Sequence, residues 1–298
     1  MSDPHWSLDE LRRQIDEVDE SLHDLLMRRA EVVAAIAALK KGNGTPAIRP
    51  GREAAILRRL VARHRGPFPP ALLVRIWREI LSGTVAMQMD FAVAVCSPEA
   101  VPGYWDLARD HYGSYTRMTP FRTPIQVVRA VTEGAASVGV LPMPAEAEQD
   151  AWWPHLISRD AQTPRVIARL PFAGRGNARG EPGDALAIGR GEQEPTGLDR
   201  TLLVIETSAE VSRGRLVAAT KTGGLAGQFV AAVENKPGTV LNLLEFDGVL
   251  SAEDARVAAA LAPLGGAADG VLLLGGYARP FTADALSEPT PSGARRQG

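Results

Sequence analysis

The sequence has few of the features that mark a secreted, membrane-bound or nucleic-acid-binding protein. It contains one cysteine, Cys96, so no disulfide can form within the chain, which is typical of a reducing compartment. No apolar run approaches the roughly 20 residues needed to cross a bilayer. The first residues do not show the basic start and apolar stretch of a signal peptide, so we expect none. The net charge of -2 offers no basic surface for nucleic acid or an anionic membrane. We therefore expect a cytoplasmic protein.

The length and composition of the chain are those of an ordinary multidomain protein. With 298 residues, 45% of them hydrophobic and 23% charged, the chain can form two or three small domains with cores of their own. Cys96 falls in "FAVAVCS", whose apolar and β-branched residues predict a buried strand. We interpret it as a small core residue rather than a nucleophile, because a buried cysteine usually behaves as a small hydrophobe.

The first long pattern predicts one amphipathic helix from Leu8 to Lys41. Ser7 is the expected N-cap, with Glu10 three residues later as in a capping box. Such a helix would be roughly 50 Å long, which is more than a domain of this size can cover, so it requires a partner. Its apolar residues follow one another at steps of three and four, with one position left out between Leu25 and Val32: Leu8, Leu11, Ile15, Val18, Leu22, Leu25, Val32, Ile36 and Leu39.

Basic residues interrupt this apolar face. Arg29 occupies the position between Leu25 and Val32, and Lys40 follows on nearly the same face, about 16 Å away. Arg12 is about 25 Å from Arg29 along the axis, so it can join these two only from a second chain running antiparallel. A lone arginine in a helix seam is commonly a register device, but the grouping favours a gap for a small anion.

Two shorter helices, predicted over residues 52–64 and 71–89, add further polar groups. These candidates are Arg49, Arg52, Glu53, Thr84 and Gln88. Taken singly, Thr84 and Gln88 could equally be solvated surface residues. The whole set is rich in cations, has one acid and lacks histidine and cysteine. It therefore indicates a pocket for a small dicarboxylate rather than a nucleophilic or metal site, and no cofactor or metal is expected.

The pattern changes after residue 89. Strands and helices alternate over residues 91–144, which predicts a parallel α/β layer. Residues 145–200 are rich in glycine, proline and charge and hold only two short strand candidates, "PRVIARLPF" and "DALAIG". From residue 200 the elements follow a βαββαβ order, which is typical of ferredoxin-like modules.

The first 89 residues resemble the all-helical chorismate mutase domain, including the form that is fused to prephenate dehydratase. The resemblance is carried by "LDELRRQIDEVDESLHDLLMRRAEVVAAIAALKK", "IRPGREAAILRRL" and "RIWREILSGTVAMQ". It implies three helices that intertwine in a homodimer and convert chorismate to prephenate by an intramolecular pericyclic shift.

The resemblance also implies a role for each matched polar residue. Arg29, together with Arg12 of the partner subunit, would hold the two carboxylates of chorismate. Lys40 and Gln88 would donate to the ether oxygen, where negative charge grows as the C–O bond stretches.

The remaining matched residues would bind the rest of the substrate. Glu53 would hold the hydroxyl group, while Arg52 and Thr84 would line the pocket and contact a carboxylate. Thr84 stands where serine is common, and this keeps the hydroxyl. The match departs at Arg49, where the pattern of the bifunctional enzymes has an acid.

Residues 91–144 resemble the first lobe of prephenate dehydratase, most clearly in "TPIQVVRAVTEGAASVGVLPMP". The polar residues of that family are missing, because its Glu-Asn-Ser/Thr positions hold Met143, Pro144 and Ala145. Its Thr-Arg-Phe step appears as Asp184, Ala185 and Leu186. We therefore do not expect dehydratase activity, and a bifunctional mutase–dehydratase is the alternative enzyme.

Residues 200–281 resemble the ACT regulatory domain, ending in "LLLGGYARP", with altered effector motifs "SRGRL" and "ENKP". An aromatic amino acid is a possible effector. The predicted domains are a mutase domain (1–90), a degenerate dehydratase-like α/β domain (91–199), an ACT-like domain (200–283) and a disordered tail (284–298). The main alternative outside enzymes is a non-catalytic ligand-binding regulatory protein.

Overall fold

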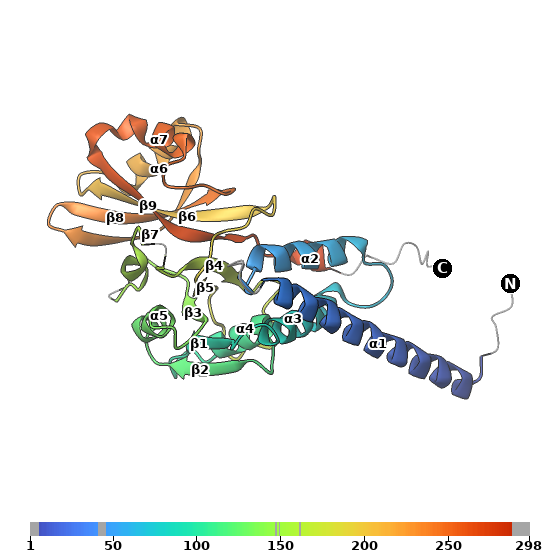
Figure 1. Ribbon diagram of the computed structural model, residues 1–298. Coiled ribbons are helices and arrows are strands. Elements are labelled where there is room, and N and C mark those ends of the chain that lie inside the picture. The colour runs from blue at the N-terminus through green and yellow to red at the C-terminus, as the bar shows by residue number, and fades with distance from the viewer. Residues whose placement is uncertain (1–5, 41–45, 147, 149, 161, 288–298) are drawn as a thin grey trace, which may run out of the picture. The chain divides into compact units, whose positions relative to one another are not determined.

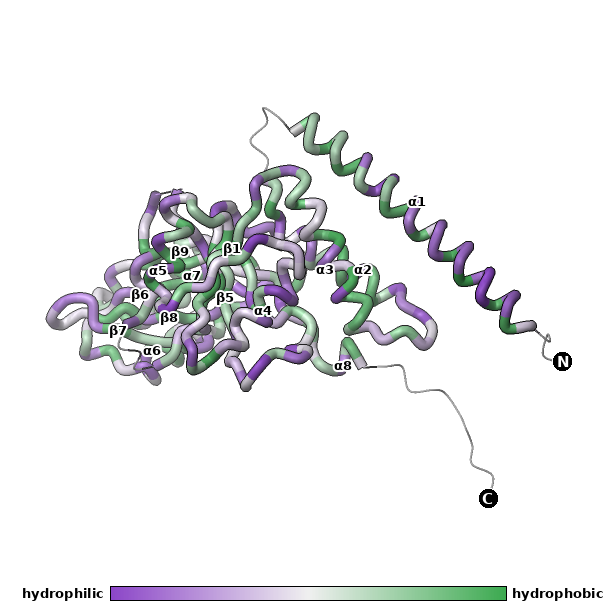
Figure 2. Tube along the Cα trace, turned by 90° about the horizontal axis from the view of Figure 1, so that it is seen from below, coloured by the Kyte–Doolittle hydropathy of each residue, from purple (hydrophilic) through white to green (hydrophobic). Residues whose placement is uncertain are grey.

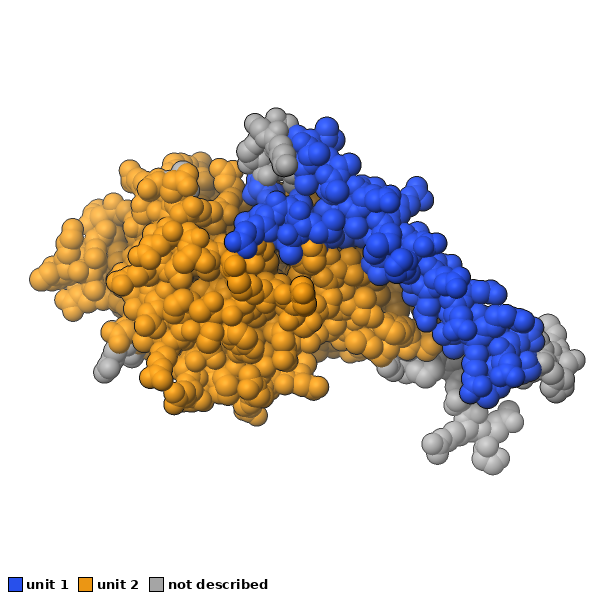
Figure 3. All heavy atoms as spheres, turned by 60° about the horizontal axis from the view of Figure 1, so that its bottom comes forward, with its two compact units in different colours: residues 1–47, 84–90 blue, residues 48–83, 91–298 orange. Residues whose placement is uncertain are grey.

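A computed structural model describes residues 6–40, 46–146, 148, 150–160 and 162–287 (Figure 1). The chain divides into two compact units, coloured in Figure 3. Unit 1 comprises Met1–Ala47 and Thr84–Asp90, and unit 2 comprises Ile48–Gly83 and Phe91–Gly298. None of the described helices is long and apolar enough to span a bilayer.

Unit 1 is dominated by the single long helix α1 (Leu8–Lys40), as the sequence predicts. The hydroxyl of Ser7 accepts a hydrogen bond from the Glu10 N–H at 3.2 Å, so this residue does cap the start of the helix. Hydrophobic and hydrophilic residues alternate along α1 (Figure 2). The apolar residues of the predicted seam are largely exposed: Leu8, Ile15, Val18, Leu22, Leu25, Val32 and Leu39 are all more than half accessible.

Unit 2 begins with α2 (Pro50–Arg63) and most of α3 (Pro70–Ala86). α3 ends at Ala86, three residues before the predicted end at Met89. Apolar residues of the two helices pack into one cluster with residues of the later chain. The buried members are Ala54, Leu57, Val74, Leu81, Phe172 and Ala278.

The rest of unit 2 is built on one nine-stranded sheet of order β2-β1-β3-β5-β4-β9-β6-β8-β7. Its first five strands are β1 (Ala92–Cys96), β2 (Arg117–Phe121), β3 (Val138–Pro142), β4 (Arg165–Leu170) and β5 (Ala185–Gly189). β1 pairs in parallel with β2 and β3, which confirms a parallel layer there, whereas β5 pairs antiparallel with β3 and β4.

The last four strands are β6 (Asp199–Ser208), β7 (Gly227–Lys236), β8 (Thr239–Asp247) and β9 (Ala268–Ala278). They pair antiparallel in the order β9-β6-β8-β7, and β4 joins this group through a parallel contact with β9. The order β6-α6-β7-β8-α7-β9 matches the predicted succession of strands and helices.

The helical segments after β1 are α4 (Gly103–Tyr112), α5 (Pro124–Thr132), η1 (Trp153–Leu156), α6 (Arg213–Thr222), α7 (Ala255–Leu261), η2 (Ala262–Ala267) and α8 (Ala283–Leu286). In α8, Leu286 packs against the cluster formed with α2 and α3 rather than on the sheet. α6 and α7 lie on the same face of the β6–β9 strands (Figure 1), over a core that includes Leu203 and Leu244. Under the earlier strands, Trp152 and Trp153 are fully buried.

The sequence pattern does not predict β2. The segment "TRMTPFR" indicates only a lead into the next helix, but Arg117–Phe121 forms a strand at the edge of the sheet. Most of its side chains are exposed, so it lacks the apolar alternation that reveals a half-buried strand. Pro120 also argues against a strand, yet proline is tolerated at a sheet edge, where its missing N–H goes unused.

Candidate active site

Arg29 stands out among the predicted cations of α1. Its side chain is partly buried, and the Nη1 atom is shielded from solvent with no hydrogen-bond partner among the described residues. Burial lowers the pKa of this guanidinium. A shielded N–H donor without an acceptor costs free energy, so an anion that supplied the acceptor would be favoured here.

Arg12 is in a different state. It is exposed, and its Nη1 atom donates to the Asp9 carboxylate at 3.3 Å within one turn of α1. An exposed pair of this kind is worth at most about 1 kcal/mol, so a better anion could readily displace Asp9. Lys40 is the last residue of α1, and its side chain lies outside the described residues.

Thr84 lies in the last turn of α3 and Gln88 lies two residues beyond its end, both in the same unit as α1. The Gln88 side-chain Nε2 donates to the Thr84 carbonyl oxygen at 2.9 Å. Both side chains are partly buried rather than fully solvated. The hydrogen bond from Gln88 reaches the Thr84 backbone and not its side chain, so the common face predicted from the spacing of four stays a prediction.

The start of α2 is held by an acid from far along the chain. The Arg49 Nε atom donates to Glu194 Oε1 at 2.6 Å, and the Arg52 backbone N–H donates to Glu194 Oε2 at 3.2 Å. Gly51 permits this approach, because a Cβ at that position would lie 2.7 Å from the Cβ of Glu194. Glu194 thus neutralises Arg49 and places a carboxylate at the positive end of the helix.

Glu53, one turn into α2, forms a buried ion pair with Arg78 of α3. Arg78 Nη1 donates to Glu53 Oε2 at 2.8 Å. Arg78 is 4% exposed, and its guanidinium lies 4.9 Å from the centre of the Phe172 ring. Burial raises the pKa of Glu53, while the positive charge of Arg78 acts in the opposite direction. The carboxylate is thereby fixed in one orientation.

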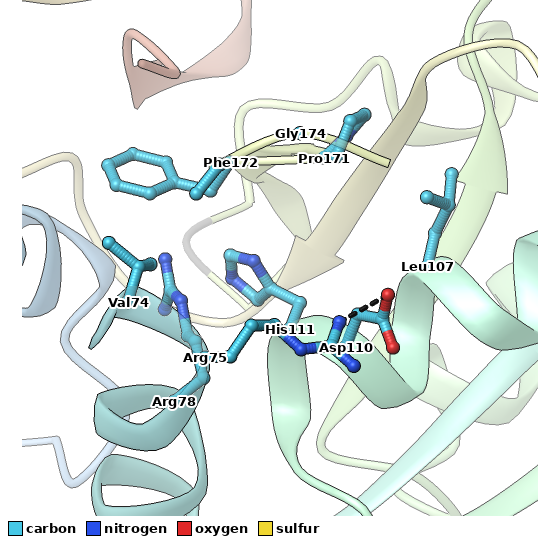
Figure 4. A pocket seen from close by; sticks show the side chains of 10 residues that line it. Val74, Arg75, Arg78, Leu107, Asp110, His111, Pro171, Phe172 and Gly174 are labelled. Atoms are coloured by element: carbon cyan, nitrogen blue, oxygen red, sulfur yellow. Dashed lines mark ion pairs between the residues drawn. The ribbon is translucent and has the colours of Figure 1, made fainter. Parts of the chain in front are cut away.

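A small cavity of about 20 Å³ lies beside Arg78 (Figure 4). It is lined by Arg75, Asp110, His111 and Phe172 among others, and Arg75 forms an ion pair with Asp110 across it. Burial and the nearby Arg78 charge hold the pKa of His111 well below its usual value. The cavity is large enough for about one water molecule, so it is not a substrate pocket.

The positions expected to carry dehydratase chemistry are occupied differently. Asp184, where the family has threonine, is held by Arg169 at 2.7 Å and Arg175 at 3.2 Å. Its carbonyl oxygen accepts a hydrogen bond from the Met143 N–H at 3.0 Å. The segment that begins at Met143 and the segment that begins at Asp184 are therefore in contact. Cys96 is 1% exposed and burial raises its pKa to about 11, so its thiol stays protonated, as expected of a core residue.

The predicted site residues thus fall into two groups. Unit 1 contains Arg12, Arg29, Lys40, Thr84 and Gln88, and unit 2 contains Arg49, Arg52 and Glu53. The sequence patterns do not predict two residues that contact this set, Arg78, which binds Glu53, and Glu194, which binds Arg49. The spacing of Val74, Arg78 and Leu81 places Arg78 on the apolar face of α3 and could have revealed it, whereas nothing in the sequence around Glu194 distinguishes it from a surface acid.

Comparison with known proteins agrees with the helical pattern. Residues 11–89 match the family Chorismate mutase type II. The resemblance to this family is confirmed for that segment. The match covers little more than a quarter of the chain, and it contains every predicted site residue from Arg12 to Gln88.

A bifunctional chorismate mutase/prephenate dehydratase of Pseudomonas aeruginosa is 32% identical over 143 residues. The match covers 46% of this chain, which is more than the mutase-like segment alone can supply, and 39% of the relative. The chain thus spans about two fifths of the length of this relative, and the likeness extends beyond residue 90 into the α/β region.

Two solved structures share a weaker likeness with 64% of this chain. A protein described as GqqA, a novel type of quorum quenching acylase, is 15% identical with a TM-score of 0.45, and 95% of that chain is covered. A prephenate dehydratase from Streptococcus mutans is also 15% identical, with a TM-score of 0.43 and 98% of that chain covered.

Proposed function

We propose that this protein is a chorismate mutase that converts chorismate to prephenate in the synthesis of phenylalanine and tyrosine. The observation that carries the proposal is Arg29, a partly buried guanidinium in an apolar helix seam with a shielded Nη1 that has no acceptor among the described residues. A substrate carboxylate supplies that acceptor, and guanidinium–carboxylate pairs are strong and directional.

The reaction requires no covalent catalysis by the enzyme. Arg29 and Arg12 of the partner subunit hold the two carboxylates, which keeps the substrate in the compact form that the rearrangement needs. Lys40 and Gln88 donate to the ether oxygen as its negative charge grows, so they stabilise the transition state more than the ground state. Removing one such donor typically costs about 3–4 kcal/mol.

Glu53 binds the hydroxyl group of the substrate. Arg78 already binds one oxygen of this carboxylate at 2.8 Å, which fixes its direction. Arg52 and Thr84 complete the lining of the pocket. Arg49 stands where related enzymes have an acid, and its charge is balanced by Glu194, so it adds little net positive charge beside the hydroxyl.

The proposal includes a homodimer. The seam of α1 leaves large apolar side chains exposed, and Leu25 is 60% accessible. A second α1 running antiparallel would cover this seam and bring Arg12 close to Arg29 of the other chain. The last four strands with α6 and α7 are proposed to form an ACT-like regulatory module, for which an aromatic amino acid is the candidate effector.

A bifunctional mutase–dehydratase is the second candidate, because the Pseudomonas relative carries both names and its likeness reaches beyond residue 90. The residues at the expected dehydratase positions weigh against it. Asp184 is engaged by two arginines, and Met143, Pro144 and Ala145 offer no side-chain group to assist departure of a hydroxyl.

The rate of chorismate loss tests the proposal. Full-length wild-type protein is compared with Arg29→Ala and with Arg28→Ala, a matched control on the exposed side of α1. We expect Arg29→Ala to lower kcat/KM by at least a hundredfold and Arg28→Ala to change it less than threefold. An inactive wild-type protein, or an Arg29→Ala variant that folds and keeps its rate, would contradict the assignment.

A further inference from the structure

A larger cavity, of about 440 Å³, lies in unit 2 where β4 faces the ends of β6, β8 and β9. It contains none of the residues assigned to the mutase reaction. Eight polar residues line it: Arg169, Arg175, Asp184, Arg200, Gln228, Glu245, Tyr277 and Arg279. Its volume falls within the range of about 300–1,000 Å³ that is usual for small-molecule sites.

The floor of the cavity is a fixed polar network. Glu245, 5% exposed, accepts a short hydrogen bond from the hydroxyl of Tyr277, which is 1% exposed. Arg169 donates to the same hydroxyl at 3.1 Å and lies 3.6 Å from the Glu245 carboxylate. Burial and the Glu245 charge raise the pKa of Tyr277, so its proton stays in place. These groups hold Arg169 in one position.

Two arginines at the rim of the cavity, Arg175 and Arg279, form ion pairs but remain about half exposed. Arg175 is 50% exposed and shares the Asp184 carboxylate with Arg169. Arg279 is 45% exposed and lies 3.8 Å from Asp247, which also accepts Arg200 at 3.1 Å. Each guanidinium has five N–H donors, so both rim arginines retain donors for a ligand.

The charges of this cluster do not balance. Four guanidinium groups, of Arg169, Arg175, Arg200 and Arg279, share three carboxylates, of Asp184, Glu245 and Asp247. One positive charge is left over. Pro171, Pro280 and Phe281 add an apolar wall to the same cavity, which suits a carbon skeleton better than a bare inorganic ion.

We propose that this cavity binds a small organic anion whose carboxylate or phosphate group is held by Arg175 and Arg279. Arginine is the residue best suited to this task, because its planar donors match both groups in a bidentate arrangement. The apolar wall takes the remainder of the ligand. This site does not depend on the mutase assignment, since it shares no residue with it.

The test is a calorimetric titration of the full-length protein with benzoate and with phenyl phosphate, each against sodium chloride at equal ionic strength. We expect at least one of the two to bind with a Kd below about 1 mM, and the stronger of them identifies the acidic group. The variants Arg175→Gln and Arg279→Gln, singly and combined, should weaken binding, by tenfold or more for the pair.

Two controls separate this cavity from other sites. Arg122→Gln removes an exposed arginine that pairs with Glu99 elsewhere on the molecule, and it should leave the Kd unchanged. Arg29→Ala removes the proposed mutase contact and should also leave it unchanged. The inference fails if neither anion binds beyond chloride, if the Arg175 and Arg279 variants bind normally, or if binding disappears in Arg29→Ala instead.

Discussion

The apolar residues of α1 and those of the nine-stranded sheet lie in opposite environments. Leu25 and Leu39 are 60% and 77% exposed, whereas Leu186 and Ile188 of β5 are fully buried. At about 25 cal/mol per Å² of apolar surface, the sheet stabilises itself within one chain, but the exposed part of the α1 seam contributes nothing of this kind until another surface covers it. The two regions therefore differ: unit 2 has its core within one chain, whereas α1 leaves an apolar surface that the proposed second copy would cover.

The largest effect is expected from charged side chains placed in the apolar seam of α1. The double variant Val18→Asp, Leu25→Asp should convert the proposed dimer to a monomer and lower the proposed chorismate turnover at least a thousandfold, because the account needs Arg12 of one chain beside Arg29 of the other. Sedimentation and a chorismate assay measure the two effects. His23→Asp, an exposed position on the side of α1 away from this seam, is the control and should remain dimeric and active.

A smaller effect is expected in unit 2 from Arg78→Met. The change leaves the Glu53 carboxylate buried without its partner, which typically costs about 3–5 kcal/mol. Thermal and urea unfolding should show this loss, and mutase activity should fall because Glu53 is no longer oriented. Arg63→Met, an exposed arginine on α2, should alter neither property. An Arg78→Met protein as stable as wild type would show that the pair does not hold α2 on α3.

Glu194→Gln should produce a milder loss, of about 0.5–1 kcal/mol in unfolding free energy, since the carboxylate is partly exposed and solvent screens its pairing with Arg49. The neighbouring Glu192→Gln is the matched control. If Glu194 balances Arg49, the double variant Arg49→Gln, Glu194→Gln should recover part of the lost stability. Additive losses would instead indicate that the two residues act separately.

The smallest predicted effect is a dependence of unit 2 stability on pH. His111 is buried between Tyr112 and Phe172 and close to Arg78, with a folded-state pKa well below its usual value. A histidine whose folded pKa is depressed loses its stabilising contribution as pH falls below about 6.5, the pKa of the unfolded state. The melting temperature of His111→Phe should therefore fall less between pH 7 and pH 5.5 than that of wild type. Equal slopes for the two proteins would count against this account.

The sequence predicts regular elements well and pairings between distant residues poorly. α1 follows from the spacing of its apolar residues, and the strand that contains Cys96 follows from a short run of apolar and β-branched residues. Both patterns are local information. Arg49 meets Glu194 and Asp184 meets two arginines only after the chain has folded, so no periodicity can reveal these contacts. The replacement of the dehydratase residues was visible in the sequence, but the charge cluster that surrounds Asp184 was not.

The domain boundaries illustrate the same limit. Residues 1–90 read as one helical domain because they resemble one family, whereas α2 and α3 up to Gly83 share a core with Phe172 and Ala278. The predicted boundaries stay a prediction, since a single chain does not show how its helices associate with a second copy. Sequence patterns identify the family of a segment, and the packing partner of that segment is a separate question.

The most direct test of the central claim is product identification after full-length protein is given chorismate, with prephenate and phenylpyruvate separated before any acid is added. The claim is that the helical segment carries the chemistry and the α/β region carries none. It predicts that prephenate accumulates in proportion to chorismate lost and that no phenylpyruvate forms. Enzymatic formation of phenylpyruvate would contradict it and assign catalytic work to the region around Asp184.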